Sequence, residues 1–365
     1  MPVMTCPAPE PFLHFEKKAA YNPLTDKRLM ASDPDFAVLK ALSRGSGDIA
    51  SLDVALRDRL LRDGWLIEPK GDPSGRYRLK YVALEATTHC NQACDFCPVS
   101  TAPRARDDMA MGIYEDIVRQ LAKHRDTIEG VSMVQYNEPT VDPLFLDRLA
   151  VLRSHDLPVA LNSNATGLTP KTVDRIEALG GLSYLSINLS TLDRAAYEAE
   201  RRHDHLPIVQ RNMDQLVDRR IAPKQDIAVL GHGDDLHEKN HAEISQRYGN
   251  GEFDVRSFRL MDRAGQVATG QRPPAPIRRL GGCEQIGSRP LQWVHITPKG
   301  ECVLCCQDYD NRYVVGDLRQ QSLDEVLTGP EMARMRRWAY GLEEAPEDFI
   351  CRKCAYARAR PGGCK

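Results

Sequence analysis

The sequence predicts an α/β fold in which parallel strands alternate with helices. Apolar strand-like runs and amphipathic runs follow one another between residues 81 and 260, and repeated β–α units build a parallel sheet with right-handed crossovers. A loop with three cysteines follows the first of these strands, and seven further cysteines lie beyond residue 280. These observations predict a central α/β region (80–268), a small N-terminal unit (1–75) and a C-terminal cysteine-rich region (280–365).

The composition indicates a globular protein without a strongly charged surface. The chain has 365 residues, a formal net charge of −2 and 42% hydrophobic residues. A nucleic-acid-binding domain is normally basic, and no apolar run is long enough to span a bilayer. The N-terminus also lacks the charged and apolar regions of a signal peptide. We therefore expect a cytoplasmic protein with no nucleic-acid or membrane partner, in which clustered cysteines bind metal rather than form disulfides.

Residues 1–75 predict a small unit of short strands and two helices, and Gly71-Asp-Pro-Ser-Gly75 predicts a linker after it. The expected elements are strands at 12–15 and 28–30, helices at 36–42 and 52–62, and a returning strand at 64–68. With the fragments Asn22-Pro-Leu-Thr25 and Asp63-Gly-Trp-Leu66, this order resembles the winged-helix element that binds leader peptides in pathways of ribosomally made, modified peptides. The alternatives are a cap over the active site or a winged helix without a ligand.

The α/β region is predicted to begin with a strand at 81–86. The later strands are expected at 130–135, 158–162, 182–188, 226–231 and 253–260, and the helices at 109–124, 142–155, 169–179 and 194–219. In α/β barrels the active site forms at the C-terminal ends of the strands. The polar residues that follow these strands are therefore the candidate site residues.

The loop after the first strand, residues 85–100, holds Cys90, Cys94 and Cys97 in a C-x-x-x-C-x-x-C spacing. Soft thiolate ligands suit zinc, copper(I) or an iron–sulfur cluster. Structural zinc sites have four protein ligands, and this loop offers no fourth, since His89 is expected to be a turn residue. Three thiolates leave one iron of a [4Fe–4S] cluster open for a small molecule. The alternative is three buried or zinc-bound cysteines.

This loop, with Phe96 directly before its last cysteine, resembles the cysteine motif of the radical S-adenosylmethionine (radical SAM) superfamily. The resemblance implies a partial (β/α)6 TIM-like barrel and a [4Fe–4S] cluster whose open iron is chelated by exchangeable SAM. It also implies a flavodoxin- or ferredoxin-type electron donor. Reductive cleavage of SAM would give methionine and a 5′-deoxyadenosyl radical, which abstracts a hydrogen atom from the substrate.

The resemblance extends to the ends of the later strands. Tyr136-Asn-Glu-Pro139 falls where the family has Gly-Gly-Glu-Pro, so Glu138 is expected near the SAM ammonium, where a carboxylate is a sensible partner. Tyr-Asn in place of Gly-Gly is a departure from the family pattern. The other residues that could bind the ribose or the carboxylate of SAM, or else be ordinary polar turns or surface positions, are Ser163, Asn164, Ser186, Asn188 and Arg201 or Arg202.

The last third of the chain predicts a hairpin at 296–306, with a turn at Pro298-Lys-Gly300. Together with the cysteines around it, this segment resembles the SPASM/twitch domain of radical SAM maturases, which binds auxiliary iron–sulfur clusters. The resemblance implies one auxiliary [4Fe–4S] cluster rather than two, because the cysteine run that follows Cys351 in the full pattern is missing. Its expected ligands are Cys283, Cys305, Cys351 and Cys354, the last two of which could alternatively belong to a zinc ribbon.

Two further cysteines, Cys302 and Cys306, have no place in this ligand set. Either is a candidate hydrogen-atom donor or thiol ligand of the substrate. Cys302 could instead be a core residue. Together with Cys305, the two could also hold a soft metalloid such as trivalent arsenic.

Three functions remain open from the sequence. The leading hypothesis is a radical SAM enzyme that modifies a peptide or natural-product intermediate, with a precursor peptide as possible partner. The second is a small-molecule enzyme: an aminocyclitol or sugar dehydrogenase or epimerase, or a transferase that moves the 3-amino-3-carboxypropyl group of SAM to a substrate such as trivalent arsenic. The third is a non-catalytic iron–sulfur or zinc-binding protein.

Overall fold

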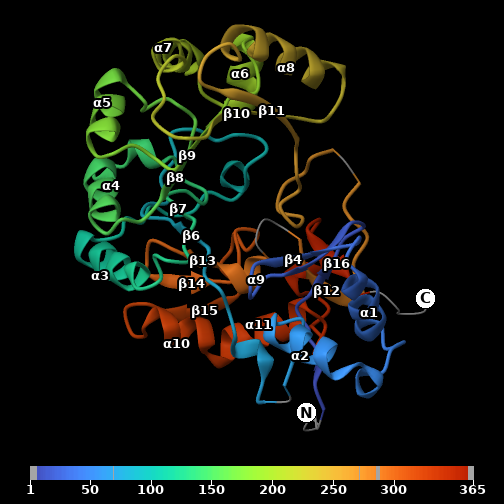
Figure 1. Cartoon of the computed structure of the whole chain (residues 1–365). Coiled ribbons are helices and arrows are strands. Elements are labelled where there is room, and N and C mark those ends of the chain that lie inside the picture. The colour runs from blue at the N-terminus through green and yellow to red at the C-terminus, as the bar shows by residue number, and fades with distance from the viewer. Residues whose placement is uncertain (1–5, 69, 271, 285–287, 361–365) are drawn as a thin grey trace. The chain divides into compact units, whose positions relative to one another are not determined.

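The computed structural model describes residues 6–68, 70–270, 272–284 and 288–360, and Figure 1 shows the chain. It forms two compact units. The sheet unit comprises residues 80–273 and 295–323. The terminal unit combines both ends of the chain, up to residue 79 and from residue 324, with residues 274–294. The three-part division expected from the sequence stays a prediction.

The sheet unit contains the parallel sheet that the β–α alternation predicts. Six neighbouring strands run parallel in the order of the chain. They are β6 (Tyr81–Leu84), β7 (Gly130–Ser132), β8 (Val159–Ser163), β9 (Tyr184–Asn188), β10 (Gln225–Gly231) and β11 (Asp254–Arg259). Beyond β6 the sheet continues with antiparallel neighbours, β13 (Trp293–Ile296), β14 (Glu301–Val303) and β15 (Val314–Asp317). The expected hairpin is formed by β13 and β14.

Helices connect the parallel strands. They are α3 (Met111–Ala122), α4 (Phe145–Ser154), α5 (Pro170–Ala178), α6 (Arg194–Arg201), α7 (Leu206–Leu216) and α8 (Asp235–Tyr248). In α3, for example, Tyr114, Ile117, Val118 and Leu121 are buried, which is the spacing of one helical face. The single helical run expected over 194–219 is two helices, because Arg202 ends α6 in the left-handed conformation (φ 59°). The sequence analysis did not predict α8.

The two faces of the parallel strands differ in burial. In β8, Val159, Leu161 and Ser163 are buried, whereas Asn162 between them is exposed. Successive side chains of a strand point to opposite faces of the sheet. One face therefore forms the core with the helices, and the other carries polar side chains.

In the first part of the terminal unit, both helices and three of the five strands lie near their predicted positions, whereas the strands Ala8–Pro9 and Ala19–Asn22 were not predicted. A three-stranded antiparallel sheet is followed by two helices and a short strand pair. These elements are β2 (His14–Phe15), β3 (Ala19–Asn22), β4 (Lys27–Met30), α1 (Pro34–Ser43), α2 (Val54–Arg62), β1 (Ala8–Pro9) and β5 (Leu66–Ile67). Phe36, Leu39, Leu60 and Trp65 belong to its core. The outer strand β4 is mostly exposed.

The remainder of the terminal unit holds the last cysteines. Its elements are β12 (Leu280–Cys283), α9 (Arg289–Gln292), α10 (Leu323–Thr328, whose first residue belongs to the sheet unit), α11 (Pro330–Ala339) and β16 (Ala357–Ala359). The two parts of this unit meet at Tyr340, whose hydroxyl lies 2.8 Å from His14 Nε2 and whose ring packs edge-on against Phe12. In the part of the chain that the structure describes, no helix combines the length and the apolar character needed to cross a membrane.

Candidate functional site

The three cysteines of the first loop lie together after the end of β6. Cys94 is buried, and Cys90 and Cys97 are half-buried. Burial raises the pKa of Cys90 to about 12, and the neighbouring thiols contribute to the rise. Burial also raises the pKa of Cys94 and Cys97. Thiols in such a place become thiolates when a metal replaces their protons.

The donor set of this loop fits an iron–sulfur cluster with one open iron. It supplies three soft sulfur ligands, which suit such clusters. Among the residues with a described position, no three His, Cys, Asp or Glu side chains are arranged around a single metal ion. A tetrahedral zinc ion requires all its ligands around one centre, whereas in a [4Fe–4S] cluster each cysteine binds its own iron.

The end of α6 holds the backbone of the cysteine loop. Ala93 N donates to the carbonyl of Arg201 at 3.1 Å, and Asp95 N donates to the carbonyl of Glu200 at 3.0 Å. Because the last carbonyls of a helix have no intrahelical partner, they are free to accept these bonds. The loop around Cys94 is thus fixed to a rigid element.

Arg201 is the side chain most closely associated with this loop. It is 2% exposed, and its Nη1 donates to Cys94 Sγ at 3.5 Å. Its guanidinium lies 4.8 Å from the centre of the Phe96 ring. It also pairs with Glu200 at 2.8 Å and donates to Asn188 Oδ1 at 2.6 Å. A guanidinium in this position stabilises a thiolate; its expected contact with the SAM carboxylate stays a prediction, as does that of exposed Arg202.

Glu138 is buried at the C-terminal edge of the sheet and joins two strand ends. Its carboxylate accepts hydrogen bonds from Ser163 Oγ at 2.8 Å, Asn164 N at 2.6 Å and both the amide and hydroxyl of Thr140. Burial raises the pKa of Glu138, and these hydrogen bonds oppose the rise. Asn164 also donates to Asn91 Oδ1 in the cysteine loop at 2.9 Å. Glu138, Ser163 and Asn164, which the sequence predicts as site residues, therefore form one network.

Ser186 and Asn188 lie on β9 with different partners. Asn188 is at the C-terminal end and accepts from Arg201. Ser186 lies earlier in the strand and donates a hydrogen bond to Asp226 on β10, which also accepts from Tyr184 Oη at 2.5 Å. Asp226 is 1% exposed. The sequence analysis did not single out Asp226, and no motif marks it.

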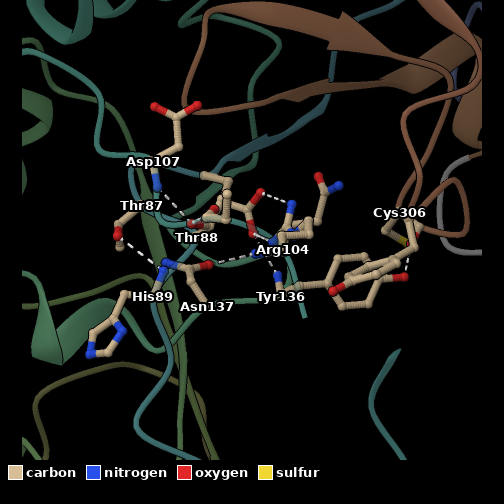
Figure 2. A network of polar contacts seen from close by, with 12 residues as sticks. Thr87, Thr88, His89, Arg104, Asp107, Tyr136, Asn137 and Cys306 are labelled. Atoms are coloured by element: carbon tan, nitrogen blue, oxygen red, sulfur yellow. Dashed lines mark hydrogen bonds and ion pairs between the residues drawn. The ribbon is translucent and has the colours of Figure 1, made fainter. Parts of the chain in front are cut away.

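A second network lies at the start of the cysteine loop (Figure 2). Glu85, directly after β6, is fully buried. Arg104 donates to both of its carboxylate oxygens, at 2.6 and 2.8 Å, and Tyr136 N donates to it at 2.9 Å. A bidentate pair of this kind fixes both position and orientation. Glu85, at the start of the cysteine loop, is thereby joined both to Arg104, four residues beyond its end, and to the turn at Tyr136.

Tyr136, the residue that replaces a glycine of the family motif, extends this network toward the C-terminal hairpin. Its hydroxyl donates to the backbone carbonyl of Cys306 (Figure 2). Tyr309 packs edge-on against Tyr136, with ring centres 4.8 Å apart. The Arg104 guanidinium lies over both rings, 5.6 and 5.1 Å from their centres. These contacts could not be anticipated from the sequence alone.

The two cysteines that the sequence leaves outside the ligand set differ in environment. Cys302 lies on β14 and is fully buried, and burial raises its pKa. Cys306 is half-buried in the segment after the hairpin. Only Cys306 of the two retains some access to its surroundings.

The four predicted ligands of the auxiliary cluster belong to both units. Cys283 is on β12, opposite Ala357 of β16, and Ala357 N donates to the carbonyl of Cys354 at 3.1 Å. Cys354 N in turn donates to the carbonyl of Cys351 at 3.3 Å. The β12–β16 pairing therefore gathers three of the cysteines within the terminal unit. Cys305 belongs to the sheet unit, and its place in the same cluster stays a prediction.

Family comparisons agree with this geometry. The model of the radical SAM superfamily matches residues 84–244, and the model of the SPASM iron–sulfur cluster-binding domain matches residues 283–355. The chain is a radical SAM enzyme with a C-terminal SPASM domain. The family implies a radical SAM [4Fe–4S] cluster, SAM and one or more auxiliary iron–sulfur clusters.

One curated relative is the tungsten-containing aldehyde ferredoxin oxidoreductase cofactor-modifying protein of Pyrococcus furiosus. It is 26% identical over 112 residues, which are 30% of this chain and 31% of that protein. The match thus spans about a third of the relative's length.

Three solved structures share the fold. SuiB of Streptococcus suis, bound to its precursor peptide SuiA, has a TM-score of 0.55 and 12% identity, covering 96% of this chain and 94% of SuiB. The anSMEcpe enzyme with bound AdoMet has a TM-score of 0.55 and 12% identity, over 76% and 86% of the two chains. BtrN in complex with AdoMet and 2-DOIA has a TM-score of 0.53 and 15% identity, over 77% and 94%.

Proposed function

We propose that this enzyme cleaves SAM reductively and uses the resulting radical to modify a peptide or a peptide-derived natural-product intermediate. The observation that carries the choice of substrate is the first part of the terminal unit. It consists of the strands β2, β3 and β4 and the helices α1 and α2, with the outer strand β4 exposed, and we propose that it acts as a winged-helix element. The assignment to a radical SAM enzyme does not depend on this choice.

The chain's own residues suit the family chemistry. Cys90, Cys94 and Cys97 would hold the [4Fe–4S] cluster, within the partial (β/α)6 barrel that the six parallel strands suggest. When bound, the cluster and SAM supply a 5′-deoxyadenosyl radical after one-electron reduction. Arg201 stabilises the Cys94 thiolate through its contact with Sγ. Glu138 orders the ends of β7 and β8, next to the expected position of the SAM ammonium.

The auxiliary site is proposed to hold one [4Fe–4S] cluster. Its ligands would be Cys283, Cys351 and Cys354 of the terminal unit, with Cys305 as the fourth. An oxidised cluster of this kind would accept an electron from the substrate radical, which gives a net oxidation or a crosslink.

If the reaction is an epimerisation, the substrate radical instead needs a hydrogen atom. Cys306 suits this role better than Cys302, because Cys302 is fully buried in β14 and Cys306 is not.

Peptide recognition is proposed to occur by strand addition at β4. An exposed edge strand offers unpaired N–H and C=O groups to an extended peptide. Met30, at the end of β4, is 51% exposed and would contact the added strand. The SuiB structure supports the proposal, since its alignment covers 96% of this chain whereas those of anSMEcpe and BtrN stop at 76% and 77%.

The test combines peptide binding with SAM cleavage by the reconstituted full-length enzyme. Where a short precursor-peptide gene adjoins the enzyme gene, its fluorescently labelled product is titrated into wild type, Met30→Asp and Val54→Asp. We expect Met30→Asp to weaken binding about tenfold, since a charge beside an added strand costs about 1.4 kcal/mol. Val54→Asp is the matched control, because Val54 is also exposed (59%) but lies on α2. Both variants should still form 5′-deoxyadenosine with dithionite.

Other outcomes identify the alternatives. Formation of 5′-deoxyadenosine without any peptide binding would exclude this proposal and favour a small-molecule substrate. Formation of 5′-methylthioadenosine would indicate transfer of the aminocarboxypropyl group.

A further inference from the structure

A group of exposed side chains lies at the turn between α6 and α7, directly after the residues that hold the cysteine loop. Arg202, His203, Ile208 and Arg211 are exposed, and His205 is half-exposed; we call these five residues the α6–α7 patch. We infer that the α6–α7 patch docks an acidic one-electron carrier protein of the flavodoxin or ferredoxin class. The inference rests on the proposed function, because reductive cleavage of SAM requires an external electron.

The patch adjoins the point where the cysteine loop reaches the surface. Asp95, directly after Cys94, is exposed and bonded to the carbonyl of Glu200. Arg201, directly before Arg202, donates to Cys94 Sγ. Cys94 itself is 8% exposed, so a protein partner cannot touch its sulfur. Two short routes therefore lead from the surface to one thiolate: a covalent route through Asp95, and a route through Arg201 that includes the hydrogen bond from Nη1 to Cys94 Sγ.

The patch is cationic with an apolar centre. His205, Ile208 and Arg211 recur every third residue, and Ile208 N donates to the carbonyl of His205 at 3.0 Å, so their side chains share one face of α7. Ile208 is 36% exposed. His203 and His205 stack with ring centres 5.3 Å apart.

The cations of the patch are available to a partner. Over the described residues, no ion pair engages Arg202 or Arg211. The acidic residue between them, Asp204, is already paired with Arg194. Asp95 and Glu198 are exposed carboxylates near the patch, and their charge would oppose the approach of an acidic partner.

This combination suits a brief electron-transfer encounter. Such complexes are among the smallest protein interfaces, and complementary charge accelerates their formation more than it tightens them. In the encounter one electron leaves the reduced carrier, which is oxidised, and enters the cluster of the loop, which is reduced. No bond forms or breaks in this step.

The experiment compares two reductants on the reconstituted holoenzyme. 5′-Deoxyadenosine formation is measured with dithionite and, separately, with a flavodoxin kept reduced by NADPH and flavodoxin reductase. For the double variant His203→Glu/Arg211→Glu we expect the KM for flavodoxin to rise about tenfold, while the dithionite rate stays unchanged. Asp95→Asn should lower that KM, and added salt should raise it for wild type more than for the double variant.

The matched control is Arg125→Glu. Arg125 is also exposed but follows α3 and precedes β7, so it lies near the amino ends of the strands, away from the cysteine loop. It should leave both rates unchanged. If the double variant retains the wild-type KM for flavodoxin, the docking assignment is wrong.

Two further outcomes are distinguishable. If wild type fails to cleave SAM with dithionite, the proposed function fails, not the docking surface. If the double variant loses iron, the neutral double variant His203→Gln/Arg211→Gln replaces it. We expect its KM for flavodoxin to rise about threefold, since charge is removed rather than reversed. Such a rise supports the inference, and an unchanged KM overturns it.

Discussion

The hydroxyl of Tyr136 donates a hydrogen bond to the backbone carbonyl of Cys306, although 170 positions separate the two residues in the sequence. Tyr136 occupies the turn after β7, and Cys306 follows the β13–β14 hairpin. Through the amide of Tyr136 and the Glu85 carboxylate, the same residue is joined to the start of the cysteine loop. One side chain thus connects the family's cysteine motif with the segment that carries Cys305 and Cys306.

Replacing Tyr136 by Phe removes this hydrogen bond and leaves a carbonyl without its partner. We expect the free energy of unfolding to fall by about 1 to 2 kcal/mol, measured by urea denaturation. Tyr114→Phe is the control, since the Tyr114 hydroxyl is buried and has no hydrogen-bond partner among the residues that the structure describes, and its removal should be neutral or stabilising. Equal losses in the two variants would contradict the role assigned to the Tyr136 hydroxyl.

Arg201→Met should impair both stability and cluster assembly. The variant leaves Glu200 without its cation and removes the donor to Cys94 Sγ; loss of one partner of a buried pair costs on the order of 3 kcal/mol. We expect iron and sulfide per chain to fall below half the wild-type value. Arg201→Lys keeps the charge but loses the planar guanidinium, so its iron and sulfide content should lie between those of wild type and Arg201→Met. Full iron loading of Arg201→Met would exclude a role for this contact.

The buried pair of Glu85 and Arg104 should be worth far more than a surface pair. Glu85→Gln weakens two short bonds to a guanidinium in a site where Glu85 is 0% exposed, and we expect a loss of about 2 to 4 kcal/mol. Glu252→Gln is the comparison, because its pair with Arg220 is well exposed and should contribute under about 1 kcal/mol. Chemical denaturation of both variants gives the difference, and similar losses would contradict this ranking.

His14 should make the stability of the terminal unit sensitive to acid. Burial, with the nearby Arg358 and Arg28, lowers the pKa of His14 from 6.5 to about 3. Between these values the unfolded chain binds a proton that the folded chain does not, so stability falls as the pH falls. The slope is about 1.4 kcal/mol per pH unit.

The measurement compares unfolding of wild type and His14→Gln from pH 4 to pH 7.5. Carboxylates titrate in both proteins, so the difference between them isolates His14. The difference in free energy of unfolding between the two proteins should be constant above pH 6.5. Below pH 6.5 it should shift in favour of the variant. A difference that is independent of pH would show that His14 titrates normally in the folded protein.

Serine substitution should separate the two cysteines outside the predicted ligand set. Cys302→Ser places a hydroxyl in the core at a fully buried position, and we expect a loss of about 1 to 3 kcal/mol. Cys306→Ser at its half-buried position should cost under about 0.5 kcal/mol. Chemical denaturation of the two variants measures these losses in the free energy of unfolding. A larger loss for Cys306→Ser than for Cys302→Ser would contradict the assignment of Cys302 to the core.

The order of the parallel strands could be predicted because each is a short apolar run between helical patterns. The helix α8 was not predicted, because only His237, Ile244 and Tyr248 of its fourteen residues are buried and its apolar periodicity is therefore weak. The boundary between α6 and α7 depends on a left-handed Arg202, for which sequence gives no reliable sign. Local patterns locate elements, but they do not reveal isolated buried positions or unusual backbone conformations.

The candidate site likewise contains residues that a local motif predicts and contacts that exist only in the folded chain. The cysteine spacing identifies Cys90, Cys94 and Cys97 as candidates because the motif is local. The contact between Arg201 and Cys94 joins residues 107 positions apart and exists only in the folded chain. Tyr136 was visible as a departure from the family motif, yet its bond to Cys306 depends on the path of the C-terminal hairpin.

The continuation of the parallel sheet into β13, β14 and β15 limits how this protein can be recombined. Glu85 N donates to the carbonyl of Ile296 at 3.0 Å, so the strand that leads into the cysteine loop has a backbone partner contributed by the last third of the chain. A chimera that exchanges everything after residue 280 for the corresponding part of a relative would replace that partner. Residues 295–323 should therefore be inherited together with the parallel strands, and a successful graft would join the two parents on either side of this stretch rather than at the start of the SPASM segment.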